Sequence, residues 1–111
     1  MSDLVILQGE FARALSKLII NAYSQGWVVT LAWSYRSPEV NNLIGGHPRS
    51  THVYRLAQDL NLFINGVYQR DSESHRPLGE YWKTLHPLAR WGGDFTRPDG
   101  NHYSFEWQGV Q

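Results

Sequence analysis

The chain has 111 residues, ten basic and ten acidic side chains, and no cysteine. The zero net charge argues against nucleic acid and anionic membrane surfaces as partners, because both favour a basic face. The lack of cysteine excludes disulfides, thiolate zinc sites and cysteine nucleophiles. A hydrophobic fraction of 41% is ample for one core, so we expect a single domain over residues 1–111.

The first segment predicts a long amphipathic helix from Asp3 to about Gln25. Gly26 follows as a natural end, and the apolar residues recur at helical spacing: Leu4, Leu7, Phe11, Leu15, Leu18 and Ala22. The same segment lacks the basic start and the uninterrupted apolar run of a secretory signal. No apolar run approaches the length that spans a bilayer. We therefore expect synthesis in the cytoplasm and no membrane insertion.

The next apolar run, from Trp27 to Trp33, is β-branched and aromatic, which predicts a buried strand. After a turn, Pro38 is well placed to open a short helix that ends at Leu43. Residues 44–50 contain two glycines and a proline and predict a loop.

A β-hairpin is predicted around Asn65-Gly66. Apolar residues alternate from 60 to 64, and an Asn-Gly pair between two such runs is the strongest short hairpin signal. The first strand should therefore begin by about Ala57, with Asp59 near its start.

His52 then lies upstream of that strand, on a loop or a short helical turn. On one continuous helix His52 and Asp59 would be about 10 Å apart along the axis, at ~1.5 Å per residue, which is awkward for sharing one ion. A bend between them allows the two side chains to converge.

The last third of the chain alternates loops with short elements. Residues 70–77 predict a polar loop, 78–86 a helix limited by Pro87, and 90–101 a second, glycine-rich loop. Residues 102–107 alternate between apolar and polar side chains, which predicts a half-buried strand with a histidine at its start.

Three candidate metal ligands therefore stand at strand ends or on the loops that lead into them: His52, Asp59 and His102. Two imidazoles and one carboxylate with an open fourth position are typical of a catalytic zinc site. Each of the three could instead be a surface or structural residue, because spacing alone is a weak argument. Asp99, three residues before His102, is placed to accept a proton from water.

Asp99 has an ordinary alternative role, because Pro-Asp-Gly is a ready-made turn. Glu106 is then the rival base, since it shares a strand face with His102. Four strand residues separate the two by roughly 13 Å at ~3.3 Å each, which makes Glu106 the poorer candidate.

Three blocks of the sequence resemble signatures of peptidase family M15, the zinc D-Ala-D-Ala carboxypeptidases and L-alanyl-D-glutamate endopeptidases. STHVYRLAQDL resembles the first signature, S-x-H-x-x-G-x-A-x-D, and WGGDFTRPDGNHYSFE resembles the second, a glycine-rich segment with an acidic residue three positions before the last zinc histidine. YRSPE resembles the block that carries the active-site arginine. The blocks occur in the expected order from Ser34 onward, and are similar especially to the small phage endolysin peptidases.

The resemblance implies an α+β fold in which an antiparallel sheet bears the zinc site and helices pack on one face, as in Hedgehog-like and DD-peptidase-like domains. It implies one zinc ion per chain on His52, Asp59 and His102. It further implies Asp99 as the general base and Arg36 as the cation beside the scissile carbonyl. The expected activity is zinc-dependent hydrolysis of a peptide bond in peptidoglycan stem peptides by this single catalytic domain.

Two departures from the signatures affect these expectations. Arg55 stands where the first signature has glycine, so the local backbone or the substrate groove can differ. Asp99 stands where D-Ala-D-Ala-specific members usually have glutamate, which favours cleavage of the L-Ala–D-Glu bond over the D-Ala–D-Ala bond. Ser50 and Trp91 are expected to contact substrate.

Two other functions fit the sequence. A zinc-containing binding domain of the same fold would keep the metal without catalysis, and a carbohydrate-binding module with exposed tryptophans would need no metal. If the chain is an endolysin-like enzyme, we expect it to remain in the cytoplasm until lysis and then act on the cell wall, or to be carried in the virion.

Overall fold

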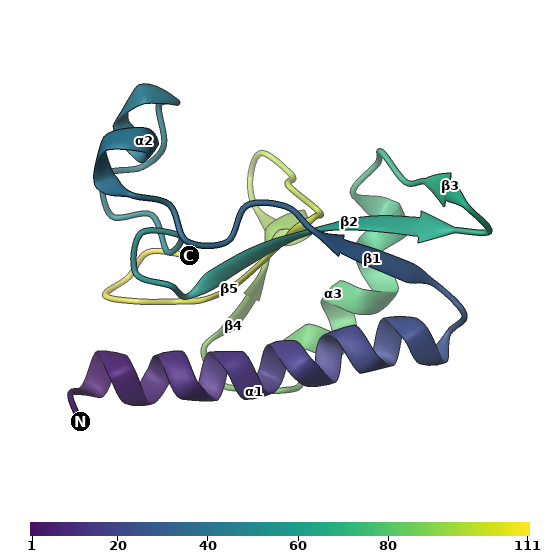
Figure 1. Cartoon of the computed structure of the whole chain (residues 1–111), viewed down its shortest axis with the longest axis horizontal. Helices are drawn as coiled ribbons and strands as arrows, with labels where there is room; N and C mark the ends of the chain where they lie inside the picture. The colour runs from purple at the N-terminus through teal and green to yellow at the C-terminus, as the bar shows by residue number, and fades with distance from the viewer.

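The computed structural model describes all residues from 1 to 111 and shows an antiparallel sheet with its two longest helices on one face (Figure 1). The α+β prediction is confirmed. The elements follow in the order α1 (Asp3–Ser24), β1 (Val28–Leu31), α2 (Pro38–Leu43), β2 (Ala57–Ile64), β3 (Val67–Tyr68), the 3-10 helix η1 (Glu73–His75), α3 (Arg76–Lys83), β4 (Ala89–Trp91), the 3-10 helix η2 (Gly92–Asp94) and β5 (His102–Phe105).

The sheet has five strands in the order β1-β2-β5-β4, with β3 paired to β2 as well. β2 is the longest strand, and every pairing in the sheet is antiparallel. Asn65 and Gly66 join β2 to β3 with φ angles of 51° and 77°, and positive φ at both positions is what a type I′ hairpin turn requires. The hairpin prediction is therefore confirmed.

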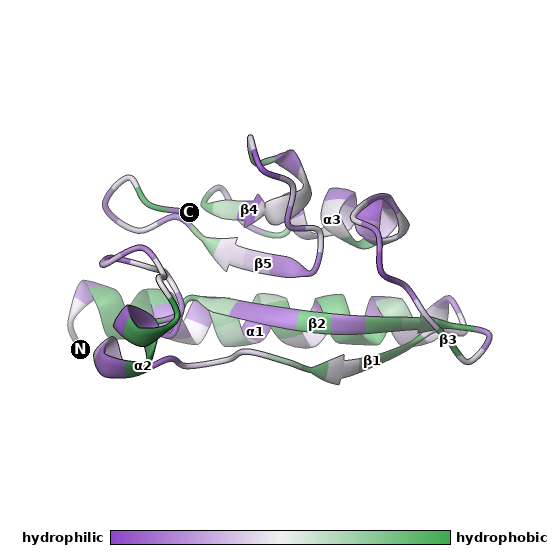
Figure 2. Cartoon of the chain, turned by 90° about the horizontal axis from the view of Figure 1, so that it is seen from above, coloured by the Kyte–Doolittle hydropathy of each residue, from purple (hydrophilic) through white to green (hydrophobic).

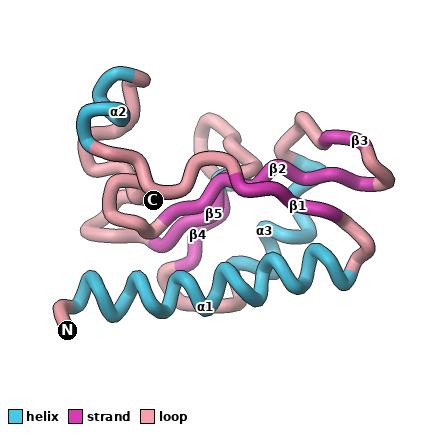
Figure 3. The backbone as a smooth tube through the Cα atoms, in the orientation of Figure 1, coloured by secondary structure: helices cyan, strands magenta, loops and turns pink.

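Helix α1 forms as its apolar periodicity predicts and lies along the length of the sheet (Figure 3). Ser2 caps its N-terminus by accepting a hydrogen bond from the Val5 amide at 3.2 Å, and the helix ends just before Gly26, whose φ is 81°. The buried face is spaced at three and four residues: Leu7, Phe11, Ala14, Leu18 and Ala22.

The core lies between α1, α3 and one face of the sheet. Trp82 of α3 is fully buried, meets Phe11 of α1 edge to face at 5.6 Å between ring centroids, and packs on Phe105 of β5. Its indole nitrogen donates to two strand carbonyls, so its polar atom is satisfied. Removing a side chain packed in this way typically costs about 3–5 kcal/mol. The helices thus cover one face, and the other face is free to carry a site.

The strand predicted as buried between Trp27 and Trp33 is shorter and more exposed than expected. β1 spans Val28–Leu31, and only Val29 reaches the core. It is an edge strand with a single neighbour, β2, and its other three residues, Val28, Thr30 and Leu31, are exposed.

Three further expectations differ from the structure in the last third of the chain. α3 begins at Arg76 rather than residue 78, because η1 leads directly into it and Pro77 is accepted in its first turn, and it ends at Lys83, before Pro87. The predicted glycine-rich loop, residues 90–101, contains the last two residues of the strand β4 and the 3-10 helix η2. β5 is buried along its whole length and lies between β2 and β4. No helix combines the length and apolarity needed to cross a membrane.

Candidate active site

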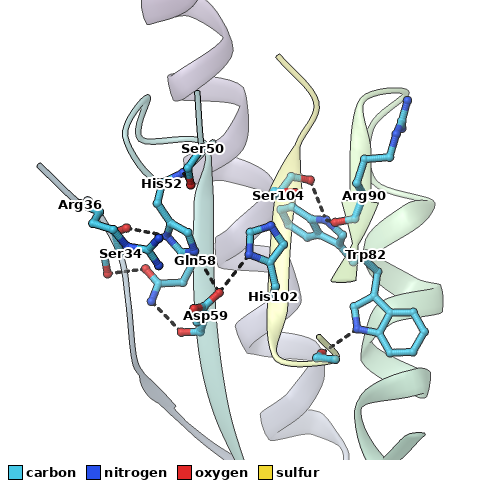
Figure 4. A network of polar contacts seen from close by, with 12 residues as sticks. Ser34, Arg36, Ser50, His52, Gln58, Asp59, Trp82, Arg90, His102 and Ser104 are labelled. Carbon is cyan, nitrogen blue, oxygen red and sulfur yellow. Dashed lines mark hydrogen bonds and ion pairs between the residues drawn. The ribbon is translucent and has the colours of Figure 1, made fainter. Parts of the chain in front are cut away.

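The three predicted metal ligands meet on the sheet face opposite α1. Asp59 of β2 lies directly across the ladder from His102 of β5, so their side chains share a face. His52 comes from the turn of residues 51–55 just before β2. Asp59 Oδ1 lies 3.2 Å from His52 Nε2 and 3.1 Å from His102 Nδ1, and all three residues are buried (Figure 4).

His52 is held in one orientation by the segment that follows β1. Its Nδ1 donates to the Ser34 carbonyl at 2.8 Å, and its own carbonyl accepts from the Arg36 amide at 3.2 Å. Because Nδ1 is engaged by that carbonyl, Nε2 is the ring nitrogen that faces Asp59 Oδ1. A backbone carbonyl on the outer nitrogen is the arrangement that orients a metal-binding histidine.

Asp59 is an ionised carboxylate at neutral pH. Burial acts to raise its pKa, but the imidazoles of His102 and His52 outweigh burial through hydrogen bonding and charge, and the pKa falls from 3.8 to about 2. A fixed negative charge therefore sits between two imidazoles on a buried part of the sheet.

This donor set fits a divalent cation. One atom from each of the three residues lies within 4.8 Å of the others, which allows a single ion to contact all three. Two imidazole nitrogens and one carboxylate oxygen are the ligands of many catalytic zinc sites, where a fourth position stays open for water or substrate. The hydrophilic stretches of β2 and β5 that supply them lie next to each other in Figure 2.

Asp99 approaches this group from the turn before β5. Its amide donates to the Gly92 carbonyl at 2.9 Å, and its carbonyl accepts from the His102 amide at 3.0 Å. Burial raises the pKa of the Asp99 carboxyl above 3.8, and the charges that also act on that pKa are those of His102, Asp59, His52 and Arg36. The Asp99 carboxyl is therefore within electrostatic reach of His102, Asp59 and His52, and it is not part of the group of three that could share one ion.

Gly92 explains why this turn needs a glycine-rich lead-in. A Cβ atom on Gly92 would collide with the Asp99 carbonyl oxygen and press on His102 Cβ. The backbone approach that positions both Asp99 and His102 is thus possible only without a side chain at this position.

Arg36 lies beside His52 and has a buried donor without a partner. Its Nη1 donates to the Asn41 Oδ1 at 3.0 Å, and its guanidinium lies 4.9 Å from the centre of the Trp33 ring. Its Nε is buried and has no partner in the protein. Asn41, a buried polar residue of α2 that sequence reasoning missed, is what holds this arginine, and its amide also donates to the His47 carbonyl at 2.7 Å.

The two expected substrate contacts differ in outcome. Ser50 lines a cavity of about 400 Å³ together with Phe95, whose ring lies 5.6 Å from that of His102. The Ser50 Oγ accepts a hydrogen bond from the His52 amide at 3.3 Å. The substrate role of Ser50 stays a prediction. Trp91 is wrong as a groove wall, because it is only 1% exposed and its indole nitrogen donates to the Gly100 carbonyl inside the core.

The structure also defines the environments of Arg55 and Glu106, the other two residues discussed from the sequence. Arg55 has a φ of 58°, so it keeps the left-handed backbone that the glycine of the signature allows, and its guanidinium lies 4.0 Å from the centre of the Tyr35 ring. Glu106, the rival base, pairs with Arg90 at 3.4 Å.

Two family descriptions match the chain. The one described as D-alanyl-D-alanine carboxypeptidase matches residues 45–105, and the one described as peptidase M15 matches residues 9–74, so each covers more than half of the chain. No curated protein matches the sequence.

Two solved structures share the fold. The L-Ala D-Glu endopeptidase ChiX of Serratia marcescens is 19% identical with a TM-score of 0.58, over 70% of this chain and 66% of that one, just under two thirds of its length. A mutant of the vancomycin resistance D,D-pentapeptidase VanY from a VanB-type resistance cassette, in complex with Zn(II), is 20% identical with a TM-score of 0.62, over 86% of this chain and 70% of that one. Both family matches span the first signature block with His52 and Asp59, and one reaches His102. The chain therefore belongs to the M15 family of peptidases.

Proposed function

We propose that this chain is a zinc-dependent peptidase that hydrolyses a peptide bond in bacterial peptidoglycan stem peptides. The convergence of His52, Asp59 and His102, with the Asp99 carboxyl beside them, carries the proposal. The names of the two structural relatives, an L-Ala D-Glu endopeptidase and a Zn(II)-bound D,D-pentapeptidase, support both the substrate class and the metal.

The chain's own residues divide the work of hydrolysis. His52, Asp59 and His102 would hold the zinc ion, which when bound lowers the pKa of water and polarises a carbonyl. Asp99 takes the proton from the attacking water and returns it to the leaving amine. Because burial raises its pKa, the Asp99 carboxylate is a stronger base than an exposed aspartate.

Arg36 stabilises the negative charge that develops on the carbonyl oxygen. Its buried Nε has no partner in the protein, so it remains free to donate to that oxygen. A preorganised donor in a partly dry site contributes more than the same group in water. The Asn41 hydrogen bond and the Trp33 ring keep the guanidinium in place for this role.

We further propose that the preferred bond is L-Ala–D-Glu, with D-Ala–D-Ala next. The support is the aspartate at position 99, where D-Ala-D-Ala-specific members usually carry glutamate. An endolysin-like setting, with synthesis in the cytoplasm and access to the wall only after release, is part of the same proposal. Cytoplasmic expression should then leave host cells intact, whereas fusion to an export signal should lyse them.

The decisive experiment incubates purified protein with defined muropeptides, with and without a chelator, and identifies products by mass spectrometry. We expect the two fragments that result from cleavage between L-Ala and D-Glu, and we expect them only when metal is present. Release of D-alanine with the L-Ala–D-Glu bond intact would assign the other specificity. A protein that binds zinc and muropeptides but releases no product would instead be a binding domain of this fold.

A further inference from the structure

The turn that carries Asp99 is held from two sides. The Gly100 amide donates a hydrogen bond to Ser72 Oγ at 2.9 Å, and the Gly100 carbonyl accepts one from the indole nitrogen of Trp91 at 2.7 Å. Ser72 belongs to the loop after β3, which rises with this turn on the side of the sheet opposite α1 (Figure 1). A Cβ atom on Gly100 would collide with the backbone of Ser72, so the loop and the turn are packed directly on each other.

Three hydrogen bonds fix the backbone before and after Asp99. The Asp99 amide donates to the Gly92 carbonyl at 2.9 Å, and the Asp99 carbonyl accepts from the His102 amide at 3.0 Å. The Asp99 carbonyl and the Gly100 amide belong to one planar peptide group, so the bond to Ser72 Oγ holds the other end of that group. Because the peptide groups on both sides of Asp99 are held, its φ and ψ angles are set, and with them the direction of its Cα–Cβ bond.

The backbone decides where the Asp99 carboxylate lies. No hydrogen bond from the protein holds this carboxylate, and the influences on its pKa are burial and charge alone. An aspartate side chain is short, so its oxygens can reach a water molecule beside the three ligands only if the Cβ atom points there. The accuracy of the proposed general base therefore depends on the turn beneath it.

Ser72 is the one partner in these three hydrogen bonds that contributes a side chain, because Gly92 and His102 use backbone atoms. The position of Ser72 is itself fixed. Its carbonyl accepts from the His75 amide at 3.0 Å, and the buried His75 Nδ1 lies 2.9 Å from the hydroxyl of Tyr103, which is fully buried in β5. The hydroxyl that holds the turn is thus anchored to the strand that supplies His102.

We propose that Ser72 is a positioning residue for hydrolysis, which holds the peptide group after Asp99 and thereby aims the Asp99 carboxylate at the attacking water. The inference rests on the proposed function, because it takes Asp99 as the general base. Without the Ser72 hydroxyl the Gly100 amide loses its partner, and the peptide group is free to rotate. A shift of about 1 Å in a reacting group can cost about 10²-fold in rate, and the two remaining hydrogen bonds keep the loss below that limit.

The test compares Ser72→Ala with Ser74→Ala, a matched substitution in the same loop. The Ser74 hydroxyl lies 2.6 Å from Asp71 Oδ1 and 3.0 Å from Gln69 Oε1, and forms no hydrogen bond with the Asp99 turn. In zinc-loaded protein we expect Ser72→Ala to lower kcat for muropeptide hydrolysis roughly 5- to 50-fold, with KM and zinc content unchanged. Ser74→Ala should keep the wild-type kcat, and thermal unfolding shows whether each variant is folded.

A double-mutant comparison separates positioning from a general loosening of the site. If Ser72 acts through Asp99, its removal has no carboxylate left to misplace in Asp99→Ala. In that background Ser72→Ala should slow the residual reaction by less than about 2-fold. An equal loss in both backgrounds would overturn the positioning role, and so would a wild-type kcat in folded, zinc-loaded Ser72→Ala.

Amide hydrogen exchange provides a readout that does not need catalysis. The Asp99 amide bonds to Gly92 and not to Ser72, so it reports on the turn as a whole. We expect it to exchange roughly 3- to 10-fold faster in Ser72→Ala than in wild-type protein or Ser74→Ala, the range of one neutral hydrogen bond. If it does so while even the wild-type protein cuts no muropeptide, Ser72 still positions Asp99 and only the proposed peptidase activity fails. An Asp99 exchange rate that is unchanged in Ser72→Ala would overturn the inference.

Discussion

The buried contact between His75 and Tyr103 makes the fold sensitive to acid, and this sensitivity has a calculable size. Burial lowers the pKa of His75 from 6.5 to about 4 in the folded protein. Between these values the unfolded chain binds a proton at this histidine and the folded chain does not, so the free energy of unfolding falls as the pH falls. The contribution is fully present above about pH 6.5 and lost by about pH 4. Each pKa unit is worth about 1.4 kcal/mol, which amounts to about 3 kcal/mol over this range.

The assay is chemical denaturation of wild-type protein and His75→Asn at several pH values from 7 to 4. Both proteins are kept in the same chelator, so that the pH dependence of metal binding does not enter. His75→Asn keeps an acceptor for the Tyr103 hydroxyl but cannot titrate, and the difference between the two curves therefore isolates His75 from the other acidic and imidazole groups. We expect wild-type protein to lose about 3 kcal/mol more than the variant on acidification. Parallel curves would show that His75 is not held neutral by burial, and would refute the reasoning.

Three further outcomes test the site. Elemental analysis should find about one zinc per chain. The zinc should be lost when alanine replaces either histidine ligand, because two remaining protein ligands are too few to hold the ion. Metal-free protein that takes up no added zinc would contradict this prediction. Asp99→Ala should keep zinc and fold but lose roughly 10²- to 10⁴-fold in rate of muropeptide hydrolysis, whereas wild-type turnover would reduce Asp99 to a turn residue and require a test of Glu106. Gly92→Ala should lower the free energy of unfolding by about 1–3 kcal/mol and also the rate, because the new methyl group displaces the Asp99 carbonyl. Gly9→Ala, with open space around it in α1, is the matched control and should stabilise by about 0.5–1 kcal/mol, as thermal unfolding will show.

Local patterns in the sequence are sufficient to predict the helices and turns that depend only on nearby residues. The spacing of Leu7, Phe11 and Leu18 determines α1, because a helix places residues three and four apart on one face. Asn65-Gly66 determines the hairpin, because few other pairs tolerate two positive φ angles. Such signals are complete within a few residues and do not need the rest of the chain.

The candidate site divides in the same way. Residue types and the signature blocks single out His52, Asp59 and His102, but the distance between them depends on pairing β2 with β5 across 43 residues of sequence. Whether an apolar side chain is buried also depends on the position of its strand in the sheet and not on the composition of the segment. The apolar segment of β1 is exposed because it forms the edge, while Trp91 is buried because β4, hidden in a glycine-rich stretch, adds to β5.

The sequence by itself determined the first helix, the hairpin and the chemical identity of the candidate ligands, since each is set by local backbone preferences or by residue type. Only the tertiary structure decided which faces are buried, how Gly92 lets Asp99 approach the ligands, and that Ser72 holds the turn that carries Asp99. These properties arise from long-range strand pairing and close packing, in which the environment of a side chain is made by residues far away along the chain.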